Sequence, residues 1–102
     1  MVSISKIIRK TREGFYEYSQ HAVDQSILRM VSTKEILEAI EHGKIIEDNP
    51  DDKYGPSCFI YGKTTDGRHI HVQCSYPSRP LLKIITVYDP DPELWINFEI
   101  RR

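Results

Sequence analysis

The 102-residue chain has 39% hydrophobic and 28% charged residues, a balance that suits one globular domain and excludes a disordered chain. Its formal net charge of −1 excludes a general electrostatic attraction to nucleic acid or to membrane surfaces. No apolar run approaches the roughly 20 residues that span a bilayer, and the start of the chain shows no signal-peptide pattern. The two cysteines are expected to be reduced thiols, which suits a cytoplasmic protein. The length of the chain predicts a single domain over residues 1–102.

Helical periodicity dominates the first half of the chain. Residues 3–13 place three isoleucines opposite basic side chains, and Gly14 can end this helix. A second helix is expected over residues 20–30, because Ser19 is a residue type that caps helices. Its apolar stripe is predicted to contain Val23, Ile27 and Met30.

A third helix is predicted from the segment Ser32-Thr33-Lys34-Glu35, which has the sequence of a capping box and starts the helix at Thr33. Gly43 is a residue type that commonly follows a helix end, so the helix should stop there. The side chains that it should bury are Ile36, Leu37 and Ile40.

The second half of the chain changes to strand periodicity. A short strand over residues 44–47, a polar loop over 49–55 and a hairpin over 58–75 precede a central strand over 81–88, which ends at two prolines. Trp95, Phe98 and Ile100 are expected to return to the body as a short helix or strand. Helices followed by a meander predict an α+β fold, with two or three N-terminal helices packed on one face of a three- to four-stranded antiparallel sheet.

The register of the hairpin is predicted from Asp66-Gly67, a dipeptide typical of two-residue turns. In that register Thr64 lies opposite His69, Gly62 opposite His71, and Ile60 opposite Gln73. Because side chains alternate along a strand, one face should join the core and the other should stay open. The core face then holds Phe59, Tyr61, Ile70, Val72 and Cys74, with Ile85 and Val87 from the next strand. The open face holds His69, His71, Gln73, Thr86 and Tyr88.

This register places Cys58 and Cys74 on opposite faces, which disfavours a disulfide because the two Cβ atoms would not converge. His69 and His71 have a spacing that suits metal ligands, but a metal site needs further ligands. Cys74 lies on the wrong face and Cys58 at the far end of the hairpin, so we predict no metal site.

The second helix carries a group of side chains that suits acid–base chemistry. His21 lies in its first turn and away from the predicted apolar stripe, with Gln25 beside it and Arg29 farther round the same flank. The helix dipole opposes protonation of a histidine at this end, so a neutral imidazole could act as a general base. The alternative is an ordinary surface or capping histidine. On the sheet, His71 opposite Gly62 is the second candidate, and Thr86 and Tyr88 share its face.

Several of these segments resemble one bacterial family, the domain-of-unknown-function family 4258. The resemblance covers residues 16–102 as the core, leaves residues 1–14 as an N-terminal helical extension, and rests on motifs in a shared order. These are Tyr18-Ser19-x-His21-Ala22, Ile36, Gly43-x-Ile45-Ile46-Glu47-Asp48, Asp52, Gly62, Asp66-Gly67-Arg68-x-Ile70-His71-Val72, Ile85-Thr86-Val87-Tyr88-x-Pro90-Asp91 and Trp95.

The family is similar to the RelE-like and MqsR-like ribonuclease toxins, so the resemblance implies an endoribonuclease that needs no metal or cofactor. RNA would be the substrate, and a cognate antitoxin protein would be the partner. In that chemistry His21 or His71 would be the general base or acid, Arg29 and Arg68 would contact phosphate, and Tyr88 would help to orient it. Gln25 stands where family members often have arginine, which removes one cation from the phosphate site.

Two alternatives remain open at this stage. The chain could be a non-catalytic binding module whose open sheet face, or whose edge strand, pairs with a partner protein or with a second copy in a homodimer. A metal-dependent enzyme using His69 and His71 would require a converging carboxylate or cysteine that the sequence does not show. A segment covering the open face would favour the binding module, and a half-exposed pocket rimmed by Arg29 or Arg68 would favour the enzyme.

Overall fold

A computed structural model describes residues 2–102; Met1, the first residue of the predicted extension, lies outside the described residues. The elements follow one another as α1 (Ile4–Arg12), β1 (Tyr16–Tyr18), α2 (Gln20–Leu28), α3 (Thr33–Glu41), β2 (Lys44–Asn49), β3 (Ser57–Lys63), β4 (His69–Ser75), β5 (Leu82–Tyr88), β6 (Trp95–Ile96) and β7 (Ile100–Arg101). The α+β class is confirmed. The main sheet has five strands in the order β1-β5-β4-β3-β2, and β6 and β7 form a separate two-stranded ribbon.

Side-chain caps start the helices where the sequence predicts. The Ser19 hydroxyl accepts a hydrogen bond from the Ala22 backbone N–H, and Ser32 and Glu35 form the expected capping box at the start of α3. These bonds span three residues, so they depend on local sequence alone. On α3, Ile36 and Ile40 are buried as expected, whereas Leu37 is only half-buried and Ala39 takes the third buried position.

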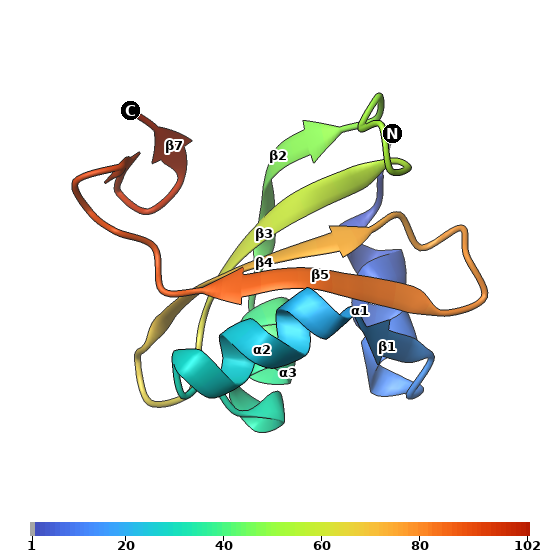
Figure 1. Cartoon of the computed structure of the whole chain (residues 1–102), viewed down its shortest axis with the longest axis horizontal. Helices are drawn as coiled ribbons and strands as arrows, with labels where there is room; N and C mark the ends of the chain where they lie inside the picture. Colours follow the sequence, from blue (N-terminus) through green and yellow to red (C-terminus); the bar gives the residue numbers. More distant parts are fainter. Residues whose placement is uncertain (1) are drawn as a thin grey trace.

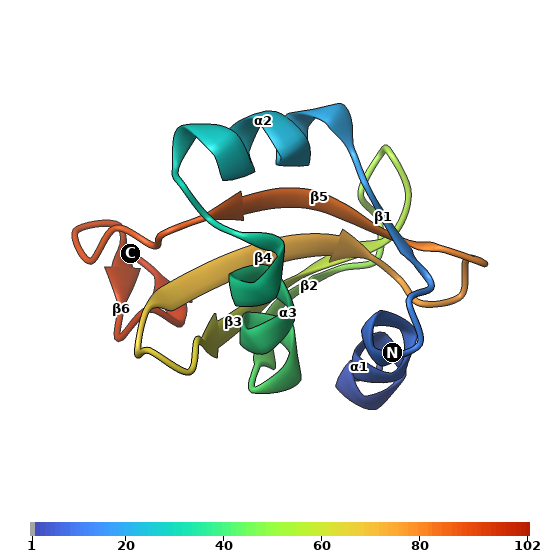
Figure 2. The same cartoon turned by 90° about the horizontal axis from the view of Figure 1, so that it is seen from below.

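The helices surround one face and one edge of the sheet. Helix α3 packs against β3 and β4, and α1 packs beside α3, so these two cover one face (Figure 2). Helix α2 runs along β5, whereas the ribbon of β6 and β7 lies at the far end of β5 (Figure 1). The buried core between these layers contains Ile7, Ala22, Val31, Ile36, Ala39, Ile40, Cys58, Ile60, Ile70, Val72, Cys74, Leu82, Ile84 and Val87.

The predicted apolar stripe of α2 is wrong. Ala22 is the buried residue of this helix, whereas Val23, Ile27 and Met30 are exposed. The reason lies in what α2 covers: it packs along the half of β5 that β1 leaves unpaired rather than across a broad sheet face, so a single small side chain suffices for close contact.

A short parallel strand, β1, accounts for the difference between the predicted antiparallel sheet and the observed mixed one. Tyr16–Tyr18 pairs with the first half of β5 in parallel orientation. The chain then turns into α2 at Ser19, whose hydroxyl donates to the carbonyl of Ile85 at 2.9 Å while it caps the helix. Therefore β1 covers the first half of the β5 edge and α2 covers the second half.

The predicted register of the β3–β4 hairpin is also wrong, by one residue. Lys63 lies opposite His69, Tyr61 opposite His71, and Phe59 opposite Gln73. The turn has three residues instead of two: the Thr64 N–H donates to the carbonyl of Arg68, and the Gly67 N–H donates to the carbonyl of Thr64. Gly67 has φ +87°, as expected for a type I turn followed by a left-handed residue.

The one-residue shift moves every β3 side chain to the other face relative to β4. Phe59 and Tyr61, predicted to join the core, lie on the histidine face. Cys58 and Cys74, predicted to lie on opposite faces, are directly opposed in the core as free thiols, with their Sγ atoms 3.8 Å apart. On β5 a bulge makes Ile84 the partner of Cys74, so Ile85 is half-buried instead of joining the core.

Gly62 lies where the hairpin and α3 approach most closely. A Cβ atom at this position would lie 1.7 Å from the backbone oxygen of Ala39, so only glycine allows the contact. We expect Gly62→Ala to reduce the free energy of unfolding by about 3 kcal/mol or more, because helix backbone would have to move. Urea unfolding, followed by circular dichroism, measures the loss.

Gly14→Ala is the matched control for this substitution. Gly14 has φ +78° and no atom within 4 Å of an added Cβ, so its loss reflects backbone strain alone, about 1 kcal/mol. Equal losses in the two variants would contradict the close contact between Gly62 and α3.

Candidate functional site

His71 lies in the middle of β4 and is completely buried. Its Nε2 lies 2.6 Å from the carbonyl oxygen of Phe98, and its Nδ1 lies 3.1 Å from the hydroxyl of Tyr88. A carbonyl can only accept, so Nε2 carries the hydrogen and donates to Phe98, while Nδ1 accepts from the Tyr88 hydroxyl. Both ring nitrogens of this imidazole are therefore engaged within the chain.

Burial lowers the pKa of His71 below its ordinary value, because the charged imidazolium would lose its hydration. The hydrogen bond to Phe98 and the charge of Glu47 act in the opposite direction, and the charge of Arg101 again lowers the pKa. The neutral form is thus the one that the fold accommodates.

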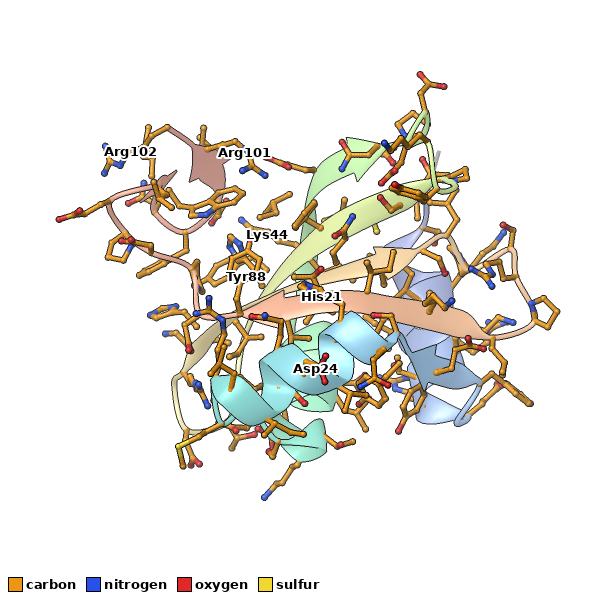
Figure 3. The ribbon with its side chains drawn as sticks, viewed as in Figure 1. His21, Asp24, Lys44, Tyr88, Arg101 and Arg102 are labelled. Carbon is orange, nitrogen blue, oxygen red and sulfur yellow. The ribbon has the colours of Figure 1, made fainter. Side chains whose placement is uncertain are left out.

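The carboxyl-terminal segment covers the face of the sheet that the sequence predicts to be open. Trp95 packs edge-on against the His71 ring with 4.5 Å between ring centroids. Two ion pairs hold the ribbon to β2, Lys44 to Glu99 at 2.6 Å and Arg101 to Glu47 at 3.0 Å. Figure 3 shows Lys44, Tyr88 and Arg101 on this side of the molecule. We call the segment from Trp95 to Arg101 the C-terminal clasp.

Aromatic rings stack beneath the clasp. The Phe98 ring lies 4.0 Å from the His69 ring, centroid to centroid, and the two planes differ by 13°. The Tyr61 ring is 5.9 Å from Phe98 and nearly parallel to it, and a hydrogen bond of 2.6 Å joins the Tyr61 hydroxyl to His69 Nδ1. All three rings are half-buried, so this stack forms part of the molecular surface.

Arg68, predicted to contact phosphate, uses every N–H of its guanidinium within the chain. Nε and one Nη donate to the carboxylate of Asp89 at 2.8 and 3.0 Å. The other N–H groups donate to Glu35 and to the backbone carbonyls of Arg29 and Met30. These bonds raise the pKa of Arg68, with the Asp89 hydrogen bond the largest cause. No donor remains for a phosphate.

The flank of α2 that holds His21, Gln25 and Arg29 runs beside β5. At the start of the helix, the Ser19 hydroxyl donates to the carbonyl of Ile85 in β5. At the end of the helix, the Arg68 guanidinium donates both to the carbonyl of Arg29 and to the carboxylate of Asp89, which follows β5 directly. The eight residue steps from His21 to Arg29 rise about 12 Å along the helix, and the four residue steps from Ile85 to Asp89 extend about 13 Å along the strand. Helix and strand therefore cover nearly the same distance over these segments. His21 therefore lies near the middle of β5 and Arg29 near its end.

Figure 3 shows His21 at the start of α2 beside β5, and Tyr88 at the end of the strand. His21 and Arg29 are exposed, and the Arg29 Nε donates to the Gln25 side chain at 3.0 Å. The described residues provide no further partner for the guanidinium side chain of Arg29, so its two Nη groups face solvent.

Tyr88 connects the two halves of this surface. Thr86 and Tyr88 lie opposite Gln73 and His71, on the face that the sequence predicts. Burial raises the pKa of Tyr88, the positive charges of Arg101 and Arg29 lower it, and the negative charge of Glu47 raises it. The hydroxyl thus lies within the electrostatic reach of two arginines.

A cavity of about 600 Å³ lies elsewhere, between α1 and α3, and no predicted site residue lines it. Among residues 2–102 no group of three or more His, Cys, Asp and Glu side chains converges as metal ligands. No helix in the described part of the chain is long and apolar enough to cross a membrane.

Four residues at this surface were missed by the sequence analysis as site residues: Lys44, Glu47, Phe98 and Arg101. Their positions depend on where the clasp docks, which no local pattern specifies. The one available signal is the pair of prolines after β5, Pro90 and Pro92, which ends the strand and frees the following residues to fold back.

The chain matches the model of one protein family. The family model described as Domain of unknown function (DUF4258) matches residues 18–89, well over half of the chain. The matched segment contains His21, Arg29, His71 and Tyr88, whereas the clasp lies beyond it. Comparison with curated proteins and with solved structures gave no match.

Arg68→Ala should destabilise the fold, because it leaves Glu35, Asp89 and two backbone carbonyls without their donor. We expect a loss of about 2 kcal/mol or more in urea unfolding, since the Arg68 side chain is only 27% exposed. Arg12→Ala is the matched control, because Arg12 pairs with Glu41 but is 67% exposed and should lose far less. A loss for Arg68→Ala no larger than that for Arg12→Ala would contradict the structural role.

His71 should make stability depend on pH. As pH falls below about 6.5 the unfolded chain takes up a proton at this position and the folded chain does not, so the free energy of unfolding should decrease. The contribution is at most about 1.4 kcal/mol per pH unit and ends once pH has fallen through the lowered pKa of the folded state.

Urea unfolding at pH 7.5 and 5.5 measures this effect. In His71→Gln the decrease should be smaller, whereas His42→Gln, which alters an exposed histidine, should keep the behaviour of the unaltered chain. The same decrease in His71→Gln and in the unaltered chain would show that other groups account for it.

Proposed function

We propose, from the premise that the chain belongs to the family described as Domain of unknown function (DUF4258), that it is a metal-independent endoribonuclease. Its site would lie on the surface between α2 and β5. The substrate would be RNA, the chain would act in the cytoplasm, and a cognate antitoxin protein would control it. The resemblance to ribonuclease toxins supports the substrate and the partner, and the reduced thiols of Cys58 and Cys74 support the compartment.

One observation carries the proposal: α2 packs along β5, with an imidazole and a guanidinium on the helix and a phenol at the end of the strand. His21 and Arg29 are the exposed groups on the helix, and Tyr88 is the partner on the strand. A general base, a cation for phosphate and an orienting hydroxyl are the groups that this chemistry needs. Gln25 lies between His21 and Arg29 along the helix, and Thr86 lies on the same strand face as Tyr88.

The reaction would use these groups as follows. His21 takes the proton of the ribose 2′-hydroxyl, and the 2′-oxygen forms a bond to the adjacent phosphorus. The bond from phosphorus to the 5′-oxygen breaks, and that oxygen takes a proton from solvent. The products are a 2′,3′-cyclic phosphate and a 5′-hydroxyl. Arg29 would hold the non-bridging phosphate oxygens through its two Nη groups.

Two predicted site residues take other parts in this proposal. His71 is buried and bonded on both nitrogens, so it acts as a positioning residue that fixes the Tyr88 hydroxyl. Arg68 fastens the end of α2 to the end of β5 and has no donor for substrate. The proposed phosphate contact therefore falls to Arg29 alone on this side.

A second candidate function is protein binding, which the apolar end of α2 favours. Ile27, Leu28 and Met30 are 72%, 73% and 83% exposed. Apolar side chains gathered on a surface commonly mark protein interaction sites. The clasp over the sheet face also favours this reading, because it closes the face that an enzyme would leave open.

Cleavage of total RNA in EDTA by the purified chain tests the first proposal. We expect cleavage to survive chelation, and His21→Ala to reduce its rate by about 10²- to 10⁴-fold, because a general base is lost. Arg29→Ala should also reduce the rate, with unfolding behaviour unchanged because the side chain is exposed.

His42→Ala is the matched control, since His42 is an exposed histidine at the end of α3, away from β5. It should cleave at the rate of the unaltered chain. An unaltered chain that leaves RNA intact at high concentration, or a His21→Ala variant that cleaves normally, would rule out the ribonuclease as proposed and favour protein binding.

A further inference from the structure

The turn of the clasp has an unusual backbone. Asn97 and Phe98 both have positive φ, +52° and +63°, and the Glu99 N–H donates to the carbonyl of Ile96 at 3.0 Å across them. Asparagine tolerates this conformation, but a bulky aromatic residue rarely adopts it. Contacts made by the Phe98 ring or backbone outside the turn must therefore stabilise this conformation.

Phe98 makes two contacts that together offset this strain. Its ring stacks on His69 at 4.0 Å and lies nearly parallel to Tyr61. Its carbonyl oxygen accepts the Nε2–H of His71 at 2.6 Å. A single residue thus presents a flat ring to a stacking surface and an oxygen acceptor to a buried donor.

A nucleobase offers the same combination of features. It has a flat π face, which stacks on aromatic and imidazole rings, and uracil and guanine also carry a carbonyl oxygen at the ring edge. We infer that Tyr61, His69 and His71 form a binding site for a carbonyl-bearing nucleobase of single-stranded RNA, which Phe98 fills in this conformation of the chain.

The site adjoins the proposed cleavage site through one hydrogen bond. The Tyr88 hydroxyl donates to His71 Nδ1, so a base held on His71 would lie next to Tyr88. The choice of RNA as the source of the base rests on the proposed function. The inference adds to it a base-recognition site beside the phosphate site.

Two of the contacts that hold the clasp closed are ion pairs at the surface. Lys44–Glu99 and Arg101–Glu47 are exposed ion pairs, and the Arg101 guanidinium lies 4.5 Å from the Trp95 ring. RNA must displace Phe98 before it can bind. The apparent affinity is therefore the intrinsic affinity multiplied by the small fraction of molecules in which the site is open. Removing the Phe98 side chain should remove the competition of its ring for the stacking position on His69.

Phe98→Gly tests the stacking part of the site, since glycine adopts positive φ without strain, removes the ring and keeps the backbone carbonyl on His71. The probe is a fluorescein-labelled decauridylate with 2′-O-methyl riboses, which binds but has no 2′-hydroxyl for cleavage. We expect its dissociation constant, measured by fluorescence anisotropy, to decrease about tenfold, the scale of one base-stacking contact. Adding His69→Ala to this variant should abolish the gain.

Two controls separate stacking from other effects. An abasic oligonucleotide of the same length should bind equally to the unaltered chain and to Phe98→Gly, because it has no base to insert. Ile100→Gly removes a large apolar side chain from the same clasp, but Ile100 is 60% exposed and has no aromatic ring to stack on His69, so it should not tighten binding.

Glu99→Gln with Arg101→Gln is a second variant, in case Phe98→Gly does not fold. It removes both ion pairs of the clasp, keeps Phe98 and leaves the net charge unchanged. Trp95, the one tryptophan of the chain, reports release of the clasp by its fluorescence. Tighter binding of decauridylate, with altered Trp95 emission, is the expected result.

Unchanged binding by folded Phe98→Gly and by the double variant would overturn the base site. The outcome is separate from that of the cleavage assay, because the probe cannot be cleaved. Loss of cleavage in His21→Ala with no effect of Phe98→Gly would leave the ribonuclease standing and reject the base site. Tighter binding without any cleavage of natural RNA would keep the base site and reject the ribonuclease.

Discussion

The turn between β3 and β4 fixes the face on which every side chain of the central hairpin lies. Its third residue, Gly67, adopts positive φ and sets a register in which Gly62 faces α3. No other residue could lie there, because a Cβ would collide with the backbone of Ala39. A one-residue slip would present Tyr61 or Lys63 to the helix instead. Turn and helix contact therefore require the same register, and that register gathers Tyr61, His69 and His71 on the opposite face.

Arg68 extends this constraint to the rest of the molecule. It follows the turn directly, and its guanidinium reaches the carbonyls that end α2, the carboxylate of Glu35 on α3, and Asp89 after β5. Helix carboxyl ends carry partial negative charge, which the half-buried Arg68 cation complements. The ends of α2 and β5 are thereby held together, and with them Arg29 and Tyr88. Arg68 was predicted to bind phosphate itself. Its structural contacts instead fix the position of Arg29, the residue proposed to bind phosphate.

Local features of the sequence predicted local features of the structure. Ser19 and Ser32 mark helix starts because a cap and its donor are three residues apart. Thr86 and Tyr88 share a face with His71 because strands alternate. The register failed because a two-residue and a three-residue turn fit the same Asp-Gly pair. β1 was missed because Tyr16–Tyr18 is short and its partner strand begins at Leu82. The burial of His71 depends on Phe98, which no periodicity connects to it.

The hydrogen bonds that run from Phe98 through His71 to Tyr88 connect the clasp to the surface of β5. While the Phe98 carbonyl accepts from Nε2, the imidazole stays neutral and Nδ1 accepts from the Tyr88 hydroxyl. If the clasp leaves, a buried donor loses its acceptor, which costs about 1–3 kcal/mol unless a new acceptor replaces it. A base with a carbonyl oxygen supplies that acceptor, whereas a base that offers only a donor there does not. The same imidazole would therefore discriminate among bases and orient Tyr88 toward the adjacent phosphate, so that base recognition and the geometry of cleavage depend on one side chain.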